Sequence, residues 1–149
     1  MNPYPSIKNL CVRDPETHSL TREIASPEVA QINRWLVTEK IDGTNIRILL
    51  HVEEDWVRTE IRGRSDNASL PKGLVGAVLP ENARAEAYVD ALECEPGDTV
   101  CVYGEGYGAG IQKVGHLYRS DKSFRAFDVT TTRDGRTWWR DWEEVVRAS

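Results

Sequence analysis

Apolar and polar residues alternate along several short stretches of the chain. Ile46, Ile48 and Leu50 alternate with other residues, which predicts a strand over residues 45–52. The same kind of pattern predicts further strands over residues 36–38, 56–62, 99–103, 124–132 and 137–139. Acidic residues at 53–55 form a turn between two of these strands, and Asp134-Gly135 is typical of a hairpin turn between the last two.

Three segments have helical patterns instead. Ser26-Pro27-Glu28 is a helix-start signal, with a capping serine and proline at the first position, and predicts a short helix to about residue 34. Ala85, Tyr88, Val89 and Leu92 fall on one stripe of a helix over residues 82–93. Residues 141–147 favour a terminal helix. Antiparallel strands with a few flanking helices predict an α+β fold, and residues 1–149 show no internal repeat, which indicates one domain.

Composition narrows the function classes. A net charge of −5 argues against a broadly basic nucleic-acid clamp, although arginines could still gather locally. No apolar run approaches the ~20 residues of a membrane span, and the start lacks a signal pattern, so we expect a cytoplasmic protein. Cys11, Cys94 and Cys101 are odd in number and have no metal-ligand spacing, which predicts reduced and mostly buried thiols.

The segment most suggestive of chemistry is Glu-Lys-Ile-Asp-Gly-Thr-Asn at residues 39–45. An unprotonated lysine amine is a nucleophile, and the Lys40 amine could attack phosphorus. Gly43 would let the backbone bend near a nucleotide, and Asp42 could hold the amine or a metal-bound water. Taken alone, the tetrapeptide from Lys40 to Gly43 is far more typical of an ordinary turn than of a nucleophile. The predicted strands on either side instead place Lys40 at a strand-to-strand junction facing a cleft.

Three further segments follow in order: Arg-Gly-Arg-Ser-Asp-Asn at 62–67, Val-Tyr-Gly-Glu-Gly-Tyr-Gly at 102–108 and Phe-Arg-Ala-Phe-Asp-Val at 124–129. With the lysine segment, they resemble the covalent nucleotidyltransferase superfamily of polynucleotide ligases and capping enzymes, most closely its phage-type RNA ligase branch. The resemblance runs from near the first residue to about residue 129. It implies an adenylation domain with an ATP-grasp-like architecture, and a reaction that uses ATP with Mg²⁺ or Mn²⁺.

The resemblance also implies a reaction and a site. Lys40 would take AMP from ATP, pass it to the 5′-phosphate of an RNA end, and a 3′-hydroxyl would then displace it and seal the strand. The resemblance makes Lys40 the nucleophile and implies roles for six other residues, namely Glu39 at the adenine edge, Asn45 in shaping the site, Arg64 at ribose or phosphates, Glu105 at ribose or metal, Phe127 stacked on adenine, and Asp128 beside it. We place Asp42 in the same nucleotide-binding site.

Most of these residues also have an ordinary structural interpretation. Phe127 could be a core residue, and Arg62 with Arg64 could form a solvated strand edge, two positions apart on one face. The glycines around Glu105 could simply make a loop. Trp138, Trp139 and Trp142 are more typical of hydrophobic packing than of base stacking, and we expect this end of the chain to be aggregation-prone or dimeric.

One departure from the family pattern is clear. The lysines after Lys40 are Lys72, Lys113 and Lys122, and none forms the Lys-x-Lys pair that holds the α-phosphate in family members. A glutamate-bearing strand that helps to bind metal is also not recognisable. We therefore expect an adenylation domain that is incomplete at its carboxy terminus. The alternatives are an inactive nucleotide-binding remnant and one subunit of a split ligase completed by a second chain.

A dinucleotide-binding fold is the other candidate. Gly104 to Ala109 matches Gly-x-Gly-x-x-Ala and follows a predicted strand. The helix that this fingerprint requires is not predicted, because residues 109–115 carry further glycines and no amphipathic stripe. Strand and helix units do not alternate either, so the sequence disfavours this fold.

Overall fold

The computed structural model of the chain describes residues 3–35, 37–78, 82–141 and 143–144. The chain divides into two compact units, Asn2–Lys40 and Ile41–Ser149. The first unit contains a small antiparallel hairpin of β1 (Cys11–Arg13) and β2 (Leu20–Ile24), followed by the 3-10 helix η1 (Val29–Gln31). Its turn is held by Asp14, whose carboxylate accepts the backbone N–H groups of Glu16 and Thr17 at 3.0 and 2.7 Å.

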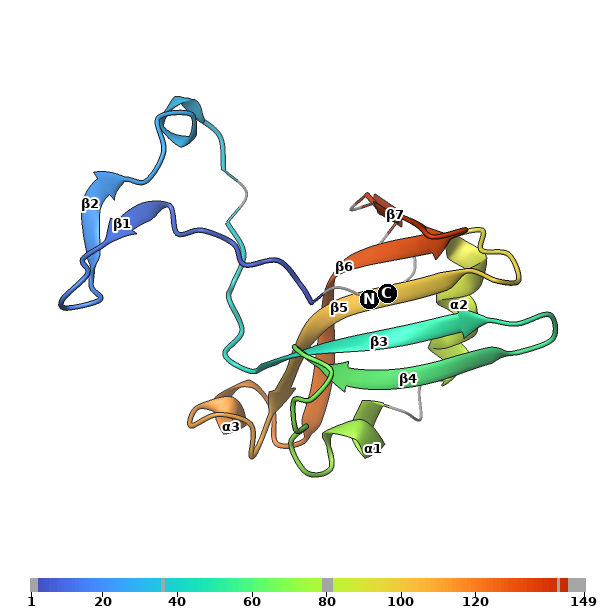
Figure 1. The fold of residues 1–149 in the computed structure, drawn as a ribbon. Coiled ribbons are helices and arrows are strands. Elements are labelled where there is room, and N and C mark those ends of the chain that lie inside the picture. Colours follow the sequence, from blue (N-terminus) through green and yellow to red (C-terminus); the bar gives the residue numbers. More distant parts are fainter. Residues whose placement is uncertain (1–2, 36, 79–81, 142, 145–149) are drawn as a thin grey trace. The chain divides into compact units, whose positions relative to one another are not determined.

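The second unit is built on a five-stranded antiparallel sheet with the order β4-β3-β5-β6-β7 (Figure 1). The strands are β3 (Thr44–Val52), β4 (Val57–Gly63), β5 (Thr99–Gly108), β6 (Lys122–Arg133) and β7 (Arg136–Trp139). Three helices accompany the sheet: α1 (Leu74–Val78), α2 (Asn82–Ala91) and α3 (Gly115–Tyr118). Within the described residues, no helix is long and apolar enough to cross a membrane.

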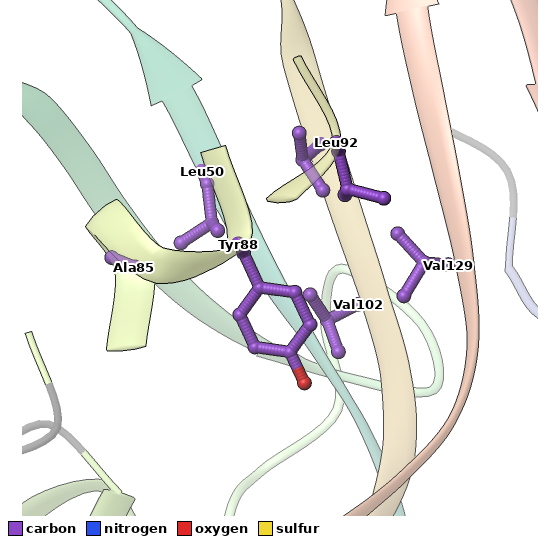
Figure 2. Packing of buried hydrophobic residues seen from close by; sticks show 7 residues of the cluster. Leu50, Ala85, Tyr88, Leu92, Val102 and Val129 are labelled. Carbon is purple, nitrogen blue, oxygen red and sulfur yellow. The ribbon is translucent and has the colours of Figure 1, made fainter. Parts of the chain in front are cut away.

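The core lies on one face of this sheet. Ala85 and Tyr88 of α2, with Leu92 just after it, pack on Leu50, Val100, Val102 and Val129 of the three central strands, as Figure 2 shows for most of them. A second cluster joins Leu74 and Val78 of α1 to Ile46 and Ile111. Since even-numbered positions of β3 and β5 point to α1 and α2, the odd-numbered positions point to the other face of the sheet.

Most of the predicted strands are confirmed to within a residue or two. The residues of the Asp134-Gly135 turn both have positive φ, 50° and 75°, as the predicted hairpin requires. The predicted helix over residues 82–93 is α2. The antiparallel α+β fold is therefore confirmed.

The strand predicted over residues 99–103 proved too short. It continues to Gly108, because Gly104 and Gly106 leave room for the Phe124 ring and Leu74 to pack across them. The glycines around Glu105 consequently belong to a strand and not to a loop. This continuation also excludes the dinucleotide fingerprint, which needs a helix at this point.

Two predictions at the end of the first unit were wrong. The helix predicted over residues 26–34 is only the single turn η1, because Ile32 is already extended and Ser26 bonds to the Glu28 carboxylate instead of capping the helix. The strand predicted over residues 36–38 is not formed at Val37 or Thr38. Val37 is 86% exposed, so no neighbouring strand covers it. Lys40 therefore does not follow a strand.

Other elements were not predicted at all. The β1–β2 hairpin, α1 and α3 are too short to give a clear periodic pattern. Leu36, Pro80, Trp142 and most of the predicted terminal helix lie outside the described residues. The three cysteines are free, Cys101 is buried, and Cys11 and Cys94 are half-buried.

One ion pair ties the turn before β5 to the end of β6. Arg133 donates two hydrogen bonds of 2.7 Å to Asp98, which is 2% exposed and also accepts the Glu95 backbone N–H at 2.9 Å. The guanidinium of Arg133 is the main reason why the pKa of Asp98 lies below its usual range. The ionised carboxylate therefore stabilises the folded state.

Replacing Asp98 should test this contribution. We expect Asp98→Asn to lower the free energy of unfolding at pH 7 by about 1–3 kcal/mol, the value of a hydrogen bond to a charged group. Because the folded-state pKa is depressed, the contribution is present above the unfolded pKa of about 4 and is lost as the pH falls through the folded value. Urea unfolding at pH 7 and at lower pH should show the gap between the two proteins narrowing.

Glu95→Gln provides the matched control. Glu95 also contacts Arg133, at 3.1 Å, but its side chain is 70% exposed. We expect a change of no more than about 0.5 kcal/mol at pH 7. Equal effects of the two substitutions would contradict the importance of the buried pair.

Candidate functional site

Three polar residues form a row across the face of the sheet opposite α2. Asn45 of β3 pairs with Glu105 of β5, and Glu105 pairs with Arg125 of β6. Directly paired residues of neighbouring strands share a face, so the three lie side by side. The structure thus brings together Asn45 and Glu105, two residues that the sequence predicted for one site, and adds Arg125.

The environment of this row suits a polar ligand. Glu105 is half-buried and Arg125 is exposed, so the row is open at its β6 end. The Oδ1 atom of Asn45 is buried and has no hydrogen-bond partner among the described residues. A buried polar atom without a partner is costly, and a bound molecule with a hydrogen-bond donor would remove that cost.

A bulge in β6 brings Phe127 and Asp128 to the next row. Tyr103 pairs with Asp128, whereas Gly104 pairs with Ala126, so Phe127 is the extra residue. Both Phe127 and Asp128 are half-buried. The two residues that the resemblance assigned to adenine therefore stand opposite one residue of β5, one row from Glu105.

The aromatic side chain of Tyr103 belongs to the same face. Its ring lies 5.5 Å from the ring of Trp139, and burial raises the pKa of Tyr103 to about 12. Trp139 is 51% exposed, whereas Tyr103 is 3% exposed. The prediction that the tryptophans pack is confirmed for Trp139, which covers Tyr103 with one side of its ring.

Two arginines stand directly opposite each other at the β3 side of this face. Arg47 pairs with Arg62, an arrangement that is unfavourable for like charges. Asp66 offsets it, because its Oδ1 lies 2.8 Å from Arg47 Nη2 and 3.1 Å from Arg62 Nη1. The hydrogen bonds from Arg47 and then Arg62 hold the pKa of Asp66 below its usual range.

Arg47 also fixes the end of β4. Its side chain is 1% exposed, and its Nε donates to the Gly63 carbonyl oxygen at 2.9 Å. Arg64 is exposed and lies just beyond the strand, so the prediction that Arg62 and Arg64 share one strand face was wrong. Arg64 instead lies in a turn that Arg47 holds by hydrogen bonds to Gly63 and Asp66, on either side of it.

The Asp42-Gly43 segment touches β5 next to Glu105. A Cβ atom at Gly43 would lie 2.3 Å from the Gly106 carbonyl oxygen and 2.8 Å from Glu105 Cγ, so only glycine fits. Two side chains hold the same segment by hydrogen bonds. Gln112 Nε2 donates to the Gly43 carbonyl oxygen at 2.8 Å, and the Asp42 amide donates to Tyr118 Oη at 3.2 Å.

Glu39 and Lys40 end the first unit. Both are exposed, and neither belongs to a helix or strand. Lys40 precedes the first residue of β3 by four positions along the chain. Its assignment as nucleophile stays a prediction.

The sequence analysis missed four residues of this region. Arg47 was not singled out, although its position two residues after Asn45 puts both on one face of β3. Arg125 was not singled out either. Gln112 and Tyr118 gave no local signal, because they lie 69 and 76 residues from the groups they contact. Among the described residues, no three histidine, cysteine or acidic side chains gather as a metal site.

The chain matches a model of a known family. A family model described as RNA ligase matches residues 33–149, which include the lysine segment and the whole sheet. No curated protein matches the chain.

The close approach of Gly43 to β5 leads to a stability prediction. We expect Gly43→Ala to lower the free energy of unfolding by about 1–3 kcal/mol, because the added methyl group meets backbone atoms of β5 that cannot move aside. Gly76→Ala in α1 is the control, since nothing lies within 4 Å of its Cβ position. It should be neutral or stabilise by up to about 1 kcal/mol. Urea unfolding of both variants would reveal a similar response if the contact were unimportant.

Proposed function

The chain belongs to the RNA ligase family, and we propose that it is an ATP-dependent adenylation domain of the phage-type branch in which Lys40 carries AMP. The observation that carries the proposal is the meeting of separate segments at the start of β3. Gly43 rests on Gly106, and Asn45 lies beside Glu105, so residues far apart in sequence share one end of one sheet face. We assign the sheet to the ATP-grasp-like architecture of such domains.

In the proposed first step, the unprotonated Nζ of Lys40 forms a bond to the α-phosphorus of ATP. The bond from that phosphorus to the bridging oxygen breaks, and pyrophosphate leaves with the electron pair while an amine proton passes to solvent. A 5′-phosphate oxygen of an RNA end then takes the AMP and frees the lysine. Attack by a 3′-hydroxyl on the activated 5′-phosphate seals the strand and releases AMP.

The other residues bind and orient the nucleotide in this proposal. Phe127 offers an aromatic face to adenine, with Asp128 beside it and Glu39 at the polar edge. Asn45 Oδ1 accepts a donor of the nucleotide, which would satisfy this buried atom. Arg64, exposed at the edge of the β4 turn, reaches ribose or phosphate oxygens as a guanidinium fork can.

A divalent cation would assist the phosphate chemistry. Mg²⁺ or Mn²⁺, when bound, would offset the charge of the triphosphate, and the Glu105 carboxylate is the residue proposed to hold it. Asp42 is exposed two residues after Lys40 and would position a water of the cation or the amine itself.

Two alternatives keep the same nucleotide site. The chain could bind ATP without transferring AMP, or it could act with a second chain that supplies phosphate-binding lysines. Both follow from the lack of a Lys-x-Lys pair after Lys40. A missing phosphate donor costs about 3–4 kcal/mol of transition-state stabilisation, which is about a hundred- to a thousandfold in rate.

Intact-protein mass spectrometry after incubation with ATP and Mg²⁺ tests the first step. We expect a covalent AMP adduct in the wild type and none in Lys40→Ala, since the bond forms on the Lys40 amine. Lys113→Ala, which removes another exposed lysine, should keep the adduct. An adduct that persists in Lys40→Ala would rule out the assignment. ATP binding in calorimetry without any adduct would favour the two alternatives.

Phe127→Ala tests the proposed adenine stack. We expect the Kd for ATP in calorimetry to rise about 5- to 150-fold, because a base–aromatic stack contributes about 1–3 kcal/mol. Trp56→Ala is the control, since Trp56 is an exposed aromatic residue near the opposite end of β3 from Asn45. An unchanged Kd in Phe127→Ala would remove Phe127 from the nucleotide site.

A further inference from the structure

We propose that Gln112 and Tyr118 are positioning residues, which hold the Asp42-Gly43 backbone and thereby orient the nucleophile segment. This inference rests on the proposed function of Lys40, which lies two residues before Asp42. The two residues belong to the loop at residues 109–121, between β5 and β6, which includes α3. Figure 1 shows α3 beside the start of β3, in agreement with the hydrogen bond between Asp42 and Tyr118.

The two hydrogen bonds hold neighbouring backbone groups, the N–H of Asp42 and the carbonyl group of Gly43. Tyr118 Oη accepts the Asp42 N–H, and Gln112 Nε2 donates to the carbonyl oxygen of the next residue, Gly43. Gly43 is also in close contact with the Gly106 backbone. Two side chains of the loop and one strand therefore fix the short path between Lys40 and β3.

The loop can hold this segment because residues beside Gln112 and at Tyr118 anchor it to the rest of the unit. Ile111 is 2% exposed in the core cluster with Leu74, and its amide donates to the Gly108 carbonyl oxygen at 3.0 Å. The Tyr118 ring meets Tyr107 edge to face at 6.1 Å between centroids. The Tyr118 hydroxyl and the Gln112 amide thus lie on or directly beside anchored residues.

The backbone of Gln112 points to a role beyond packing. Its φ of 57° lies in the left-handed region, which disfavours side chains other than glycine, asparagine or aspartate. Glycine would adopt this conformation without strain. Strained residues of this kind persist where the surrounding structure requires them and gather at ligand-holding sites. The Gln112 side chain is exposed, yet its amide donates a hydrogen bond to Gly43 and does not point freely into solvent.

Positioning matters here because the proposed reaction depends on the approach of one amine to one phosphorus atom. A displacement of about 1 Å in such a geometry can cost about a hundredfold in rate without changing how tightly the substrate binds. Glu39 and Lys40 lie in a segment with no helix or strand, so the contacts at Asp42 and Gly43 are the next fixed point along the chain.

Gln112→Gly and Tyr118→Phe separate positioning from folding. The first removes the amide while relieving the left-handed strain, and the second removes only the hydroxyl and keeps the ring against Tyr107. We expect both variants to fold at least as well as a Lys113→Ala control from the same loop. We also expect the rate of AMP adduct formation with saturating ATP to fall about five- to tenfold per lost hydrogen bond, with an unchanged Kd for ATP.

A second measurement requires no chemistry. Hydrogen exchange of the Asp42 amide, followed by NMR, should be several-fold faster in Tyr118→Phe than in the wild type. Adduct formation at the wild-type rate in both variants, or equal exchange at Asp42, would overturn the positioning role. A wild type without any Lys40 adduct would instead overturn the proposed function, and the exchange rates would then decide the positioning role by themselves.

Discussion

The register between β3 and β5 is the constraint on which the rest of the site depends. A strand that shifts by one residue turns every side chain to the other face. Ile46 pairs with Gly104 toward the helices, and Asn45 therefore pairs with Glu105 away from them. The apolar core beneath the sheet thus fixes which polar groups meet above it. The close contact of Gly43 with β5 is a second constraint on the same register.

The face of the sheet opposite α2 includes a buried arginine. Arg47 is 1% exposed, and burying a charged group is unfavourable unless it is paired and hydrogen-bonded. Its bonds to Gly63 and Asp66 meet that requirement and at the same time hold the turn before Arg64. Buried Arg47 thus supports the turn that carries exposed Arg64. Such support suits a binding site, because it positions an exposed side chain without covering it.

The sequence predicted the fold where side chains carried a clear period. Strands over residues 45–52 and the stripe from Ala85 to Leu92 follow from alternation or helical spacing, and the structure agrees. Prediction from the sequence failed where contacts with distant residues decided the conformation. Gly104 and Gly106 have no side chains, so their strand became evident only with Phe124 and Leu74 packed against them. The site could not be predicted fully for the same reason. Strand pairing places Asn45 beside Glu105, whereas the sequence motifs gave only the order of these residues along the chain.

The match to the RNA ligase family begins at residue 33, within the first unit, and continues through the second. The family region therefore includes a segment, residues 37–40, that has no helix or strand. The proposed nucleophile, Lys40, lies on this segment, where no hydrogen-bonded secondary structure holds it in place. Its geometry must come from the nearest fixed backbone, which is Asp42-Gly43 between β5 and the 109–121 loop. In the proposed function, the lysine that reacts and the residues that position it thus belong to different parts of the chain.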